Sequence, residues 1–186
     1  MRFIFLGAPG AGKGTQSEKI AERFSIPKLS TGVMLRSEMN AGSELGDKIT
    51  DIMNSGYLVP DEIMIELIAN RLNDADCTEG FILDGFPRTQ PQAEALDVIF
   101  AKLPKQKLFV VSLDVEQDEL IKRLSGRFTC VNCGTNYHKH FNKTKVEGVC
   151  DKCGATDFNF RKDDSEEAVK VRLEVYNKET APLVDY

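Results

Sequence analysis

The sequence predicts an α/β fold of three layers, in which a mostly parallel sheet is covered by helices on both faces. Two observations predict these layers. Short apolar runs alternate with segments of helical periodicity, and a glycine-rich loop joins the first run to the first helix. A third observation predicts an inserted mini-domain at residues 127–160, hereafter the insert. This stretch is rich in Cys, Asn, Lys and Gly and has little apolar periodicity.

The expected strands are short apolar runs. Residues 2–6 (RFIFL) come first, and FILD at residues 81–84 ends in a carboxylate. A short strand near residues 28–30 and the run LFVVSLDV at 108–115 bring the number to four. Continuous apolar runs of this length are typical of parallel strands that are buried on both faces, so we expect residues 108–115 to be buried.

The expected helices lie between and after these strands. They run from the glycine-rich loop to about residue 24, over residues 61–73, 89–102 and about 116–125, and from about residue 163 onward. Within the second helix, Ile63, Leu67 and Leu72 recur at helical spacing. For the last helix, Asp164 is the expected N-cap, with Glu167 three positions later.

Composition and charge exclude several classes of protein. The chain has 186 residues, of which 41% are apolar and 28% charged, as is usual for a globular protein with one main domain. No apolar run approaches the ~20 residues that cross a bilayer, and the N-terminal residues do not resemble a signal peptide. The net charge of -5 argues against broad binding to nucleic acid or to anionic membranes. We therefore expect a cytoplasmic protein without nucleic-acid or membrane partners.

The glycine-rich loop GAPGAGKGT, residues 7–15, directly follows the first strand and opens the first helix. Its glycines let backbone N–H groups surround phosphate oxygens, and Lys13 adds a point charge for the terminal phosphates. The usual pattern has Ser or Thr after the lysine, whereas here Gly14 precedes Thr15, so the loop hydroxyl is a weaker candidate for direct ligation of Mg²⁺. The alternative is a turn without a ligand, but glycines, lysine and context agree on a nucleotide phosphate site in a P-loop α/β/α core.

Charged side chains that suit phosphate chemistry lie beyond the loop. Asp84 ends its strand at the edge where the P-loop lies and could hold Mg²⁺, with salt bridging or helix capping as the alternative. Arginines grip phosphate bidentately, and the chain has nine. Those whose spacing around the P-loop favours phosphate binding over a surface role are Arg88, Arg123, Arg127, Arg161 and Arg172. Arg123 and Arg127 are four residues apart, so we expect them to crowd on one helical face unless an anion lies between them.

Four of the five cysteines form two C-x-x-C pairs, namely Cys130, Cys133, Cys150 and Cys153. This spacing fits a tetrahedral four-thiolate zinc site, and glycines directly after each pair suit tight turns. Because the protein supplies all four ligands, we expect structural zinc, which would provide much of the folding energy of a polar insert with little core of its own. Two disulfides are the alternative, disfavoured in a reducing cytoplasm, and iron or cobalt would fit the same thiolates. We expect His138 and His140 to be exposed, and assign no role to Cys77.

Together these motifs resemble those of adenylate kinases. The resemblance is carried by the loop at residues 7–15, Ser30-Thr31-Gly32 with Arg36, the run Asp84-Gly85-Phe86-Pro87-Arg88-Thr89, and Arg161-Lys162-Asp163-Asp164. It extends over essentially the whole chain, and the DGFPRT run combined with this loop is specific to nucleoside monophosphate kinases. The insert is similar to the long zinc-containing lid of many bacterial members.

The resemblance implies a core at residues 1–29, 60–126 and 161–186, an AMP-binding segment at 30–59 and a zinc-binding lid at 127–160. It implies ATP contacts by Gly10, Ala11, Gly12, Lys13, Gly14, Thr15, Arg123, Arg127, Asn136 and Tyr137. It implies AMP contacts by Thr31, Arg36, Tyr57, Leu58, Val59, Gly85, Phe86, Pro87, Arg88, Gln92, Arg161 and Arg172. The catalytic residues would be Lys13, Asp84, Arg88, Arg123, Arg127, Arg161 and Arg172. ATP, AMP and ADP are the implied partners of a monomer that uses Mg²⁺ and structural Zn²⁺.

Two features depart from the family pattern. Val33 stands where many members have an Asp that orders magnesium-bound water, so we expect an altered metal affinity or rate. Members usually continue past the position of Tyr186 with a further strand and a C-terminal helix, and the loop before that strand contacts the ATP adenine. Core stability and ATP affinity are expected to fall if the chain stops at this position.

The expected reaction is reversible transfer of the γ-phosphoryl group of ATP to AMP, which gives two ADP. No general base is needed, because the AMP phosphate is already an anionic nucleophile. A UMP or CMP kinase is the rival within the class, disfavoured by Thr31 and by the long insert. The rivals from other classes are a nucleic-acid-binding zinc-ribbon protein with an ATPase core, and a nucleotide-binding module without kinase activity.

Overall fold

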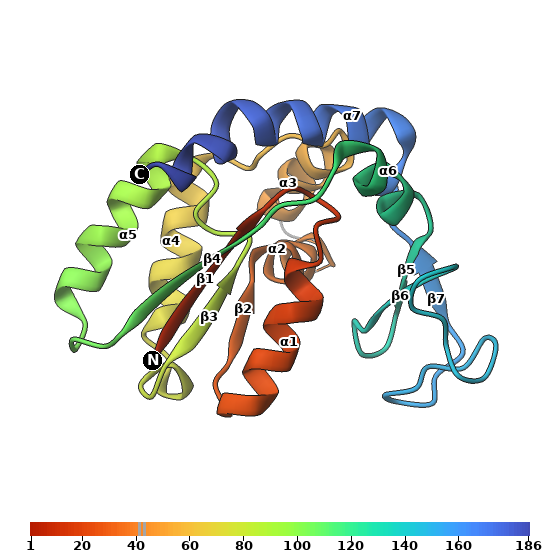
Figure 1. Cartoon of the computed structure of the whole chain (residues 1–186), viewed down its shortest axis with the longest axis horizontal. Coiled ribbons are helices and arrows are strands. Elements are labelled where there is room, and N and C mark those ends of the chain that lie inside the picture. Colours follow the sequence, from red (N-terminus) through yellow and green to blue (C-terminus); the bar gives the residue numbers. More distant parts are fainter. Residues whose placement is uncertain (41, 43) are drawn as a thin grey trace.

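The main sheet of the protein consists of four parallel strands in the order β2-β3-β1-β4 (Figure 1). The computed structural model describes the whole chain except residues 41 and 43. The strands are β1 (Arg2–Gly7), β2 (Lys28–Ser30), β3 (Phe81–Asp84) and β4 (Leu108–Leu113). The four predicted strands are thus confirmed. Because they pair in parallel, their carboxyl ends all lie at the same end of the sheet.

Seven α-helices accompany this sheet in the described part of the chain. They are α1 (Lys13–Phe24), α2 (Thr31–Asn40), α3 (Glu44–Asn54), α4 (Asp61–Leu72), α5 (Gln90–Lys102), α6 (Gln117–Ser125) and α7 (Glu166–Val175). Shorter helical turns are η1 (Ala75–Cys77), η2 (Lys162–Asp164), η3 (Tyr176–Thr180) and η4 (Ala181–Val184). Among the described residues, no helix has the length and apolar character needed to cross a bilayer.

The helices cover both faces of the sheet because successive side chains of a strand point to opposite faces. Phe3 and Phe5 of β1 belong to the apolar cluster that Ile20 of α1 joins. Ile4 and Leu6 belong to the larger cluster on the other face, to which α4 and α5 contribute. A third cluster packs α6 and α7 against the loop after β1. The predicted three-layer α/β/α core is confirmed, with α6 and α7 lying over the carboxyl ends of the strands (Figure 1).

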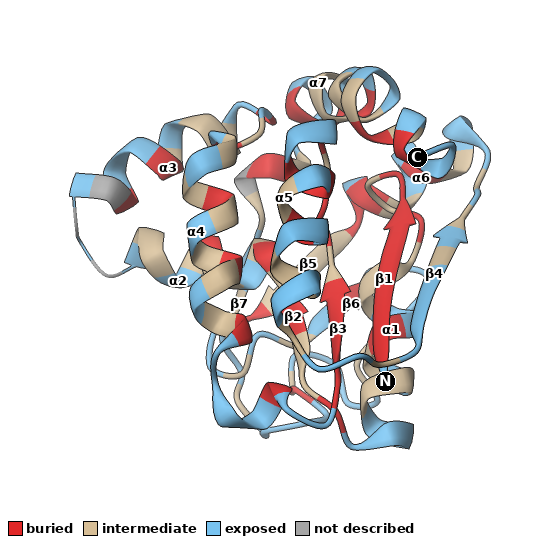
Figure 2. Cartoon of the chain, turned by 90° about the vertical axis from the view of Figure 1, so that its left-hand side faces the viewer, coloured by how far each residue is buried: buried red, intermediate tan, exposed pale blue. Residues whose placement is uncertain are grey.

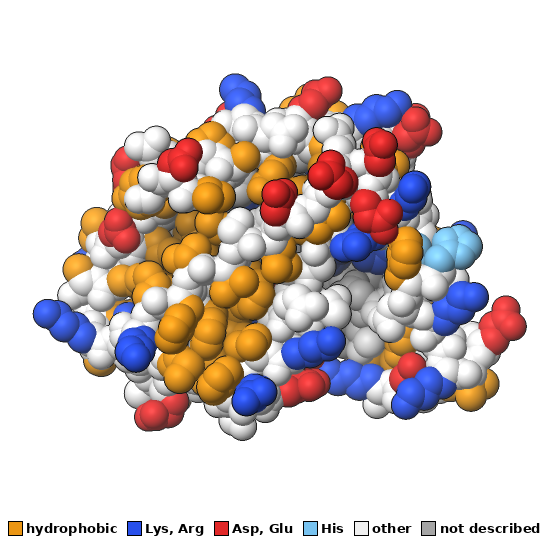
Figure 3. Space-filling view, viewed as in Figure 1, with side chains coloured by type: hydrophobic (Ala, Val, Ile, Leu, Met, Phe, Trp, Pro, Cys, Tyr) orange, Lys and Arg blue, Asp and Glu red, His pale blue; other side chains and the backbone are white. Residues whose placement is uncertain are grey.

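The expectation that the run from residue 108 would be a buried strand is wrong. β4 is the edge strand of the sheet, next to β1, and its residues Leu108, Phe109 and Val110 are exposed. Figure 2 shows this contrast between β4 and the buried β1 and β3, and Figure 3 shows hydrophobic side chains gathered over this part of the surface. An apolar run predicts a parallel strand correctly, but its place at the centre or the edge depends on strand order, which the local sequence does not specify.

The N-cap of the last helix also differs from the prediction. α7 begins after Ser165, whose hydroxyl accepts a hydrogen bond from the Ala168 backbone N–H at 3.3 Å. Asp164, the predicted cap, lies one residue earlier, in η2, and uses its carboxylate to bind arginines. Both residue types cap helices well, so their order along the chain could not decide between them.

The insert forms a second, antiparallel sheet of three strands in the order β6-β5-β7. These strands are β5 (Arg127–Cys130), β6 (Asn136–His138) and β7 (Phe158–Phe160). Contrary to the expectation of little core, Phe128, Tyr137 and Phe158 pack together with ring centroids 5.3–5.8 Å apart. This aromatic cluster continues into the buried Cys130 and Cys150, so apolar packing and the cysteine site share one small core.

Candidate active site

The loop between β1 and α1 has the form predicted for a phosphate-binding loop. At Gly10, where φ is 85°, a Cβ atom would lie 3.0 Å from a backbone oxygen of α6, so only glycine fits between the loop and that helix. Lys13 donates from Nζ to the carbonyl oxygens of Gly7 at 2.6 Å and Ala8 at 3.0 Å. Burial of the ammonium group, together with the charge of Arg88, lowers the pKa of Lys13 to about 7. A bound anion would therefore stabilise a charge that burial in the loop disfavours.

Asp84 ends β3 beside this loop, as the sequence predicted. A Cβ atom on Gly14 would lie 3.5 Å from the Oδ2 atom of Asp84, so the residue after the lysine faces the carboxylate. The negative charge of Asp84 acts on both Lys13 and Arg88, since it favours the charged form of each. An oxygen ligand next to a phosphate-binding loop suits Mg²⁺ that is carried by nucleotide phosphates.

A cleft of about 560 Å³ lies between α2, the turn after α3, the segment after β3, and α7. The predicted AMP contacts that line it are Thr31, Arg36, Tyr57, Leu58, Val59, Gly85, Arg88, Gln92, Arg161 and Arg172. Two further predicted contacts lie elsewhere, because the Phe86 side chain is buried in the core and Pro87 lines a neighbouring cleft. Val33, the residue that departs from the family pattern, is half exposed on α2.

Arg36 is the clearest anion-binding group of this cleft. Its Nη1 atom is buried and has no hydrogen-bond partner in the described part of the chain. Burial, followed by the charge of Arg161, lowers the pKa of Arg36 to about 9. A buried guanidinium nitrogen without a partner is costly, and an anionic ligand in the cleft would satisfy it.

A network of hydrogen bonds positions Arg88 at the wall of the cleft. The carbonyl oxygen of Gly85 accepts from Arg88 Nε at 2.8 Å and from the hydroxyl of Thr31 at 2.9 Å. At Gly85, where φ is 86°, a Cβ atom would lie 2.8 Å from the guanidinium of Arg88, so glycine is required. The backbone N–H of Arg88 donates to the side chain of Gln92 at 2.8 Å.

Asp61 completes this network and was missed by the sequence analysis. Its Oδ1 atom accepts from Gln92 Nε2 at 2.7 Å and from the Thr89 hydroxyl at 3.0 Å. The Gln92 side-chain oxygen is thereby turned toward the Arg88 backbone. Asp61 is the first residue of α4, and in the sequence it reads as an ordinary acidic residue of a first helical turn. Only the position of Asp61 at the start of a predicted helix could have pointed to this role. Its partners Thr89 and Gln92 lie about thirty residues away in the sequence.

A second cleft, of about 500 Å³, adjoins the first and contains Lys13. Residues common to both clefts are Gly56, Leu58, Gly85, Arg88 and Arg172. The P-loop lysine and the cleft of Arg36 therefore lie on the two sides of Arg88 and Arg172. Two anionic ligands held in the two clefts would meet at these guanidinium groups.

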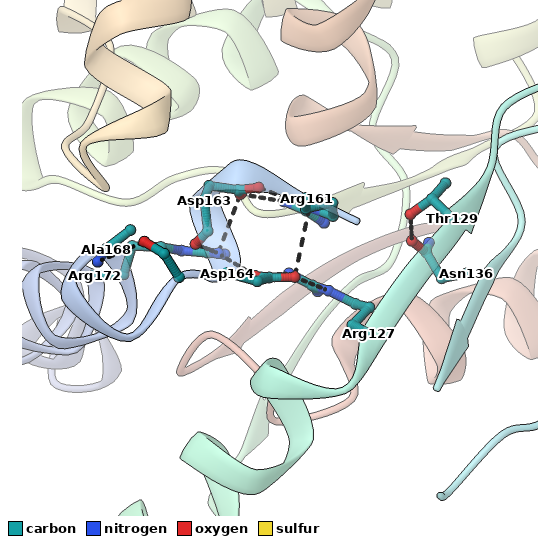
Figure 4. A network of polar contacts seen from close by, with 9 residues as sticks. Arg127, Thr129, Asn136, Arg161, Asp163, Asp164, Ala168 and Arg172 are labelled. Carbon is teal, nitrogen blue, oxygen red and sulfur yellow. Dashed lines mark hydrogen bonds and ion pairs between the residues drawn. The ribbon is translucent and has the colours of Figure 1, made fainter. Parts of the chain in front are cut away.

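Three arginines and two aspartates form an ion-pair network beside the clefts (Figure 4). Asp164 accepts from Arg127 Nη2 at 2.6 Å and from Arg172 Nη1 at 2.9 Å, and Asp163 pairs with Arg161 and with Arg172. Burial alone would raise the pKa of Asp163, but the hydrogen bond and charge of Arg161 outweigh it and hold that pKa well below its usual range. Three cations against two anions leave the network with one positive charge, which favours an additional anion.

Arg123 does not join this network. It lies on α6 and donates to the carboxylate of Glu119 at 3.3 Å, with a half-exposed side chain. The expectation that Arg123 and Arg127 would share a helical face is wrong, because α6 ends at Ser125 and Arg127 is the first residue of β5. Gly126 at the C-cap ends the helix between them.

The predicted ATP contacts of the insert do not line either cleft. The Asn136 side chain accepts a hydrogen bond from the Thr129 hydroxyl at 2.9 Å on the exposed side of the small sheet (Figure 4). Tyr137 is buried in the core of the insert. The expectation that His138 is exposed is also wrong, since this side chain is buried, whereas His140 is exposed as expected.

The four cysteines converge on a candidate metal centre. All four Sγ atoms lie within 4.8 Å of one another. Cys130 is 3.6 Å from Cys153, and Cys133 is 3.5 Å from Cys150, so each C-x-x-C turn contributes to both close pairs. These distances are much longer than the ~2.05 Å of a disulfide and are close to the ~3.8 Å between thiolates that surround zinc tetrahedrally at ~2.3 Å. The cysteines are free, and the disulfide alternative is excluded for this structure.

The two C-x-x-C turns form equivalent backbone hydrogen bonds. The backbone N–H groups of Gly134 and Gly154 donate to the carbonyl oxygens of Cys130 and Cys150 at 3.0 and 2.8 Å. The Tyr137 hydroxyl accepts from a backbone N–H at 2.8 Å and lies 3.3 Å from the Cys150 sulfur, so its own proton can point to that sulfur. A donor beside a thiolate is typical of the surroundings of a structural metal.

Comparison with known proteins agrees with this geometry. The family described as "Adenylate kinase" matches residues 5–186. Adenylate kinases of Methanosarcina barkeri, Allorhizobium ampelinum and Caldicellulosiruptor bescii are 52%, 50% and 50% identical to the chain. Each alignment covers all of this chain and 86% of the relative. The site of two adjoining clefts, with its P-loop and arginines, thus lies in a chain that belongs to the adenylate kinase family.

Proposed function

We propose that this chain is an adenylate kinase that transfers the γ-phosphoryl group of ATP to AMP reversibly and so gives two ADP. The observation that carries the proposal is the meeting of two clefts at Arg88 and Arg172. The cleft that contains Lys13 and adjoins the P-loop suits ATP phosphates, and the cleft of Thr31 and Arg36 suits AMP. The relatives named above support adenine nucleotides as substrates.

Transfer between these sites requires positioning and charge neutralisation rather than a base. An oxygen of the AMP phosphate attacks the γ-phosphorus while the bond from that phosphorus to the β-phosphate bridging oxygen breaks, and ADP leaves on each side. Arg88 and Arg172 line both clefts, which supports the proposal that they would hold the non-bridging oxygens of the migrating group. Lys13 would neutralise the phosphates of ATP from the other side.

Mg²⁺ bound to the ATP phosphates would supply further charge neutralisation, and Asp84 is the residue placed to hold it directly or through water. Because Gly14 stands after the lysine, space remains between the carboxylate and the start of α1. Asp84 also favours the charged forms of Lys13 and Arg88, so it would maintain the cations that grip the nucleotides.

The insert would act as a zinc-stabilised lid. It is joined to the core at Arg127, which pairs with Asp164, and its cysteines suit a structural zinc ion because four thiolates leave no open coordination position. Residues 30–59, which hold α2 and α3, would form the AMP-binding segment. Closure of the lid over bound ATP would exclude water and bring Asn136 and the Tyr137 backbone to the nucleotide. Arg123 of α6 and Arg127 at the start of the lid would bind the ATP phosphates.

We further propose that the protein is a monomer and that it works in a reducing cytoplasm. Four free cysteines grouped as metal ligands support the compartment, since such thiols would otherwise oxidise. The alternatives raised by the sequence receive no separate support. The zinc-ribbon alternative, in particular, predicts salt-dependent binding to single-stranded nucleic acid, which can be measured directly.

The test is an acceptor panel. Purified protein is mixed with Mg·ATP and with AMP, UMP, CMP or GMP, and formation of each diphosphate is followed. Rapid ADP formation with AMP alone is expected. Preferential turnover of UMP or CMP would replace the proposal with a pyrimidine kinase. Nucleotide binding by folded protein without turnover of any acceptor would replace it with a binding module.

A further inference from the structure

His138 occupies the junction between the core and the insert. It is the last residue of β6, and it pairs across the small sheet with Arg127, the first residue of β5. Its imidazole is buried against Gly126, where a Cβ atom would lie 2.5 Å from Cε1 of the ring. Gly126 is also the residue that ends α6. The ring therefore fills the place that a side chain would need at the turn from α6 into β5.

Hydrogen bonds fix the tautomer of this ring. Nδ1 faces the backbone N–H groups of His140 at 3.0 Å and Phe141 at 3.2 Å, which can only donate. Nε2 faces the carbonyl oxygen of Lys122 at 3.2 Å, which can only accept. The proton must therefore lie on Nε2, and the neutral ring bridges α6 to the turn after β6.

The position of this bridge matters because of its neighbours along the chain. Lys122, whose carbonyl oxygen receives the hydrogen bond, directly precedes Arg123, and Gly126 directly precedes Arg127. These two arginines are assigned to the ATP phosphates under the proposed function. The imidazole thus spans the segment that sets the distance and orientation between them.

We propose that His138 is a positioning residue, which holds α6 and the insert in the arrangement that places Arg123 and Arg127 for ATP, and which releases this arrangement when its ring is protonated. The inference rests on the proposed function for the roles of the two arginines. The hydrogen-bond geometry of the ring does not depend on that function.

Protonation conflicts with both the hydrogen bonds and the surroundings. A proton on Nδ1 would face two N–H donors, so the contacts with His140 and Phe141 would be lost. The charged groups that act on the ring are His140 and Lys139 beside it and Arg127 from β5, and each disfavours the charged ring, whereas the backbone carbonyl oxygen of Lys122 on α6 favours it. Burial comes first among the causes that lower the pKa of His138. The bridge is therefore intact at neutral pH and is lost only as the pH falls below about 6.5, the ordinary value for histidine.

The first measurement detects the ring itself. The chain has only two histidines, so His140→Gln leaves His138 as the single imidazole. In the ¹⁵N-labelled His140→Gln protein, NMR of the ring nitrogens should show Nδ1 unprotonated and Nε2 protonated at pH 7.5, with titration below 6.5. A proton on Nδ1, or titration at the ordinary value, would overturn the inference. This readout is independent of catalysis.

The second measurement is the Michaelis constant for Mg·ATP. It is determined for His138→Gln and for the control His140→Gln, and the two values are compared. Gln can donate to Lys122 but lacks an acceptor at the place of Nδ1, so at pH 7.5 its Michaelis constant should be about fivefold higher, as expected for a lost hydrogen bond. Below the pKa that the NMR titration gives for the ring, the two proteins should converge, because the protonated histidine has lost the same acceptor. Titration of the nucleotides affects both proteins equally and cancels in the ratio.

The outcomes separate the inference from the proposed function. A ratio that stays constant from pH 7.5 to a pH below the pKa measured for the ring contradicts the positioning role, even if both proteins are active kinases. Absence of turnover in the folded control protein contradicts the proposed function instead. Isothermal titration of Mg·ATP with the same two proteins then supplies the affinity ratio on which the inference is judged.

Discussion

Arg127 and Asp164 form a bidentate ion pair, in which Nη2 donates to Oδ1 at 2.6 Å and Nε donates to Oδ2 at 2.8 Å. Arg127 begins β5, and Asp164 lies four residues after the end of β7. The pair therefore joins the two points at which the chain enters and leaves the insert. Asp164 also accepts from Arg172 of α7 at 2.9 Å, which ties this junction to the core.

The first prediction is that Asp164→Asn destabilises the protein by on the order of 2 kcal/mol, because two largely buried guanidinium groups lose a charged partner. Urea unfolding measures the change. Glu166→Gln is the matched control, since Glu166 forms an exposed pair with Lys170 at 2.9 Å, and its loss should leave the free energy of unfolding nearly unchanged. Equal losses in the two variants would show that the Asp164 pairs contribute no more than a surface pair.

The second prediction concerns Arg88, which lies where the two clefts meet. Arg88→Ala should lower turnover by about 10²- to 10³-fold through loss of charge stabilisation in the transition state, while the melting temperature stays near that of the native protein. Arg88→Lys keeps the charge but not the two-pronged geometry, so it should restore only part of the rate. Arg23→Ala, at an exposed position of α1, is the control. Unchanged turnover in Arg88→Ala would remove Arg88 from the catalytic group.

The third prediction is that the purified chain holds one zinc ion per molecule, measured by elemental analysis, and that a chelator lowers its melting temperature. The insert has a small aromatic core, so it should loosen first, with later loss of the whole fold. Cys153→Ser should reproduce the effect without a chelator. Val131→Ala, an exposed change between Cys130 and Cys133 in the other turn, should not. A metal-free protein with an unchanged melting temperature would contradict the structural role of zinc.

The parts of this architecture that were predicted correctly depend on short stretches of sequence. The P-loop, the position of Asp84 and the C-x-x-C turns each follow from a few adjacent residues whose chemistry and backbone needs agree. Ten of the twelve residues that the resemblance assigns to AMP line the first cleft, and their contact with AMP stays a prediction.

The parts that could not be predicted depend on contacts between distant segments. Asp61 binds partners on another helix, and β4 became an edge strand through strand order. Helical spacing suggested that Arg123 and Arg127 share a face, but one glycine between them ended the helix. His138 looked like a spare polar residue next to a complete set of metal ligands, and only its burial against Gly126 shows otherwise.

The fourth prediction concerns stability in acid. The arginines hold the pKa of Asp163 below the value of 3.8 that it regains on unfolding, so the unfolded chain binds the extra proton and stability falls as the pH drops below about 5. Asp163→Asn should lose about 2 kcal/mol or more at pH 7 and decline less between about pH 5 and pH 3. Urea unfolding at several pH values measures both effects. Asp157→Asn, at an exposed position of the insert, should follow the native curve. An identical pH dependence for Asp163→Asn would contradict the assignment.

The fifth prediction is that binding of Mg·ATP takes up a proton at Lys13. In the empty loop the pKa of Lys13 is about 7, so the ammonium group is largely deprotonated at pH 8.5. A triphosphate beside it favours the charged form and should return the pKa toward the ordinary 10.5, so binding at pH 8.5 takes up nearly one proton. At pH 6 the group is already charged, and uptake by Lys13 should vanish. Calorimetric titration in buffers of different ionisation enthalpy measures the number of protons.

Lys13→Arg is the variant that isolates this proton. A guanidinium group stays charged at both pH values, so the variant can still attract the phosphates but has no proton to gain. Uptake at pH 8.5 should therefore fall from nearly one proton to close to zero, although the weaker fit of arginine in the loop lowers the affinity. Equal uptake in both proteins would locate the proton on another group. The carbonyl oxygens of Gly7 and Ala8 would then hold a lysine that is charged even in the empty loop.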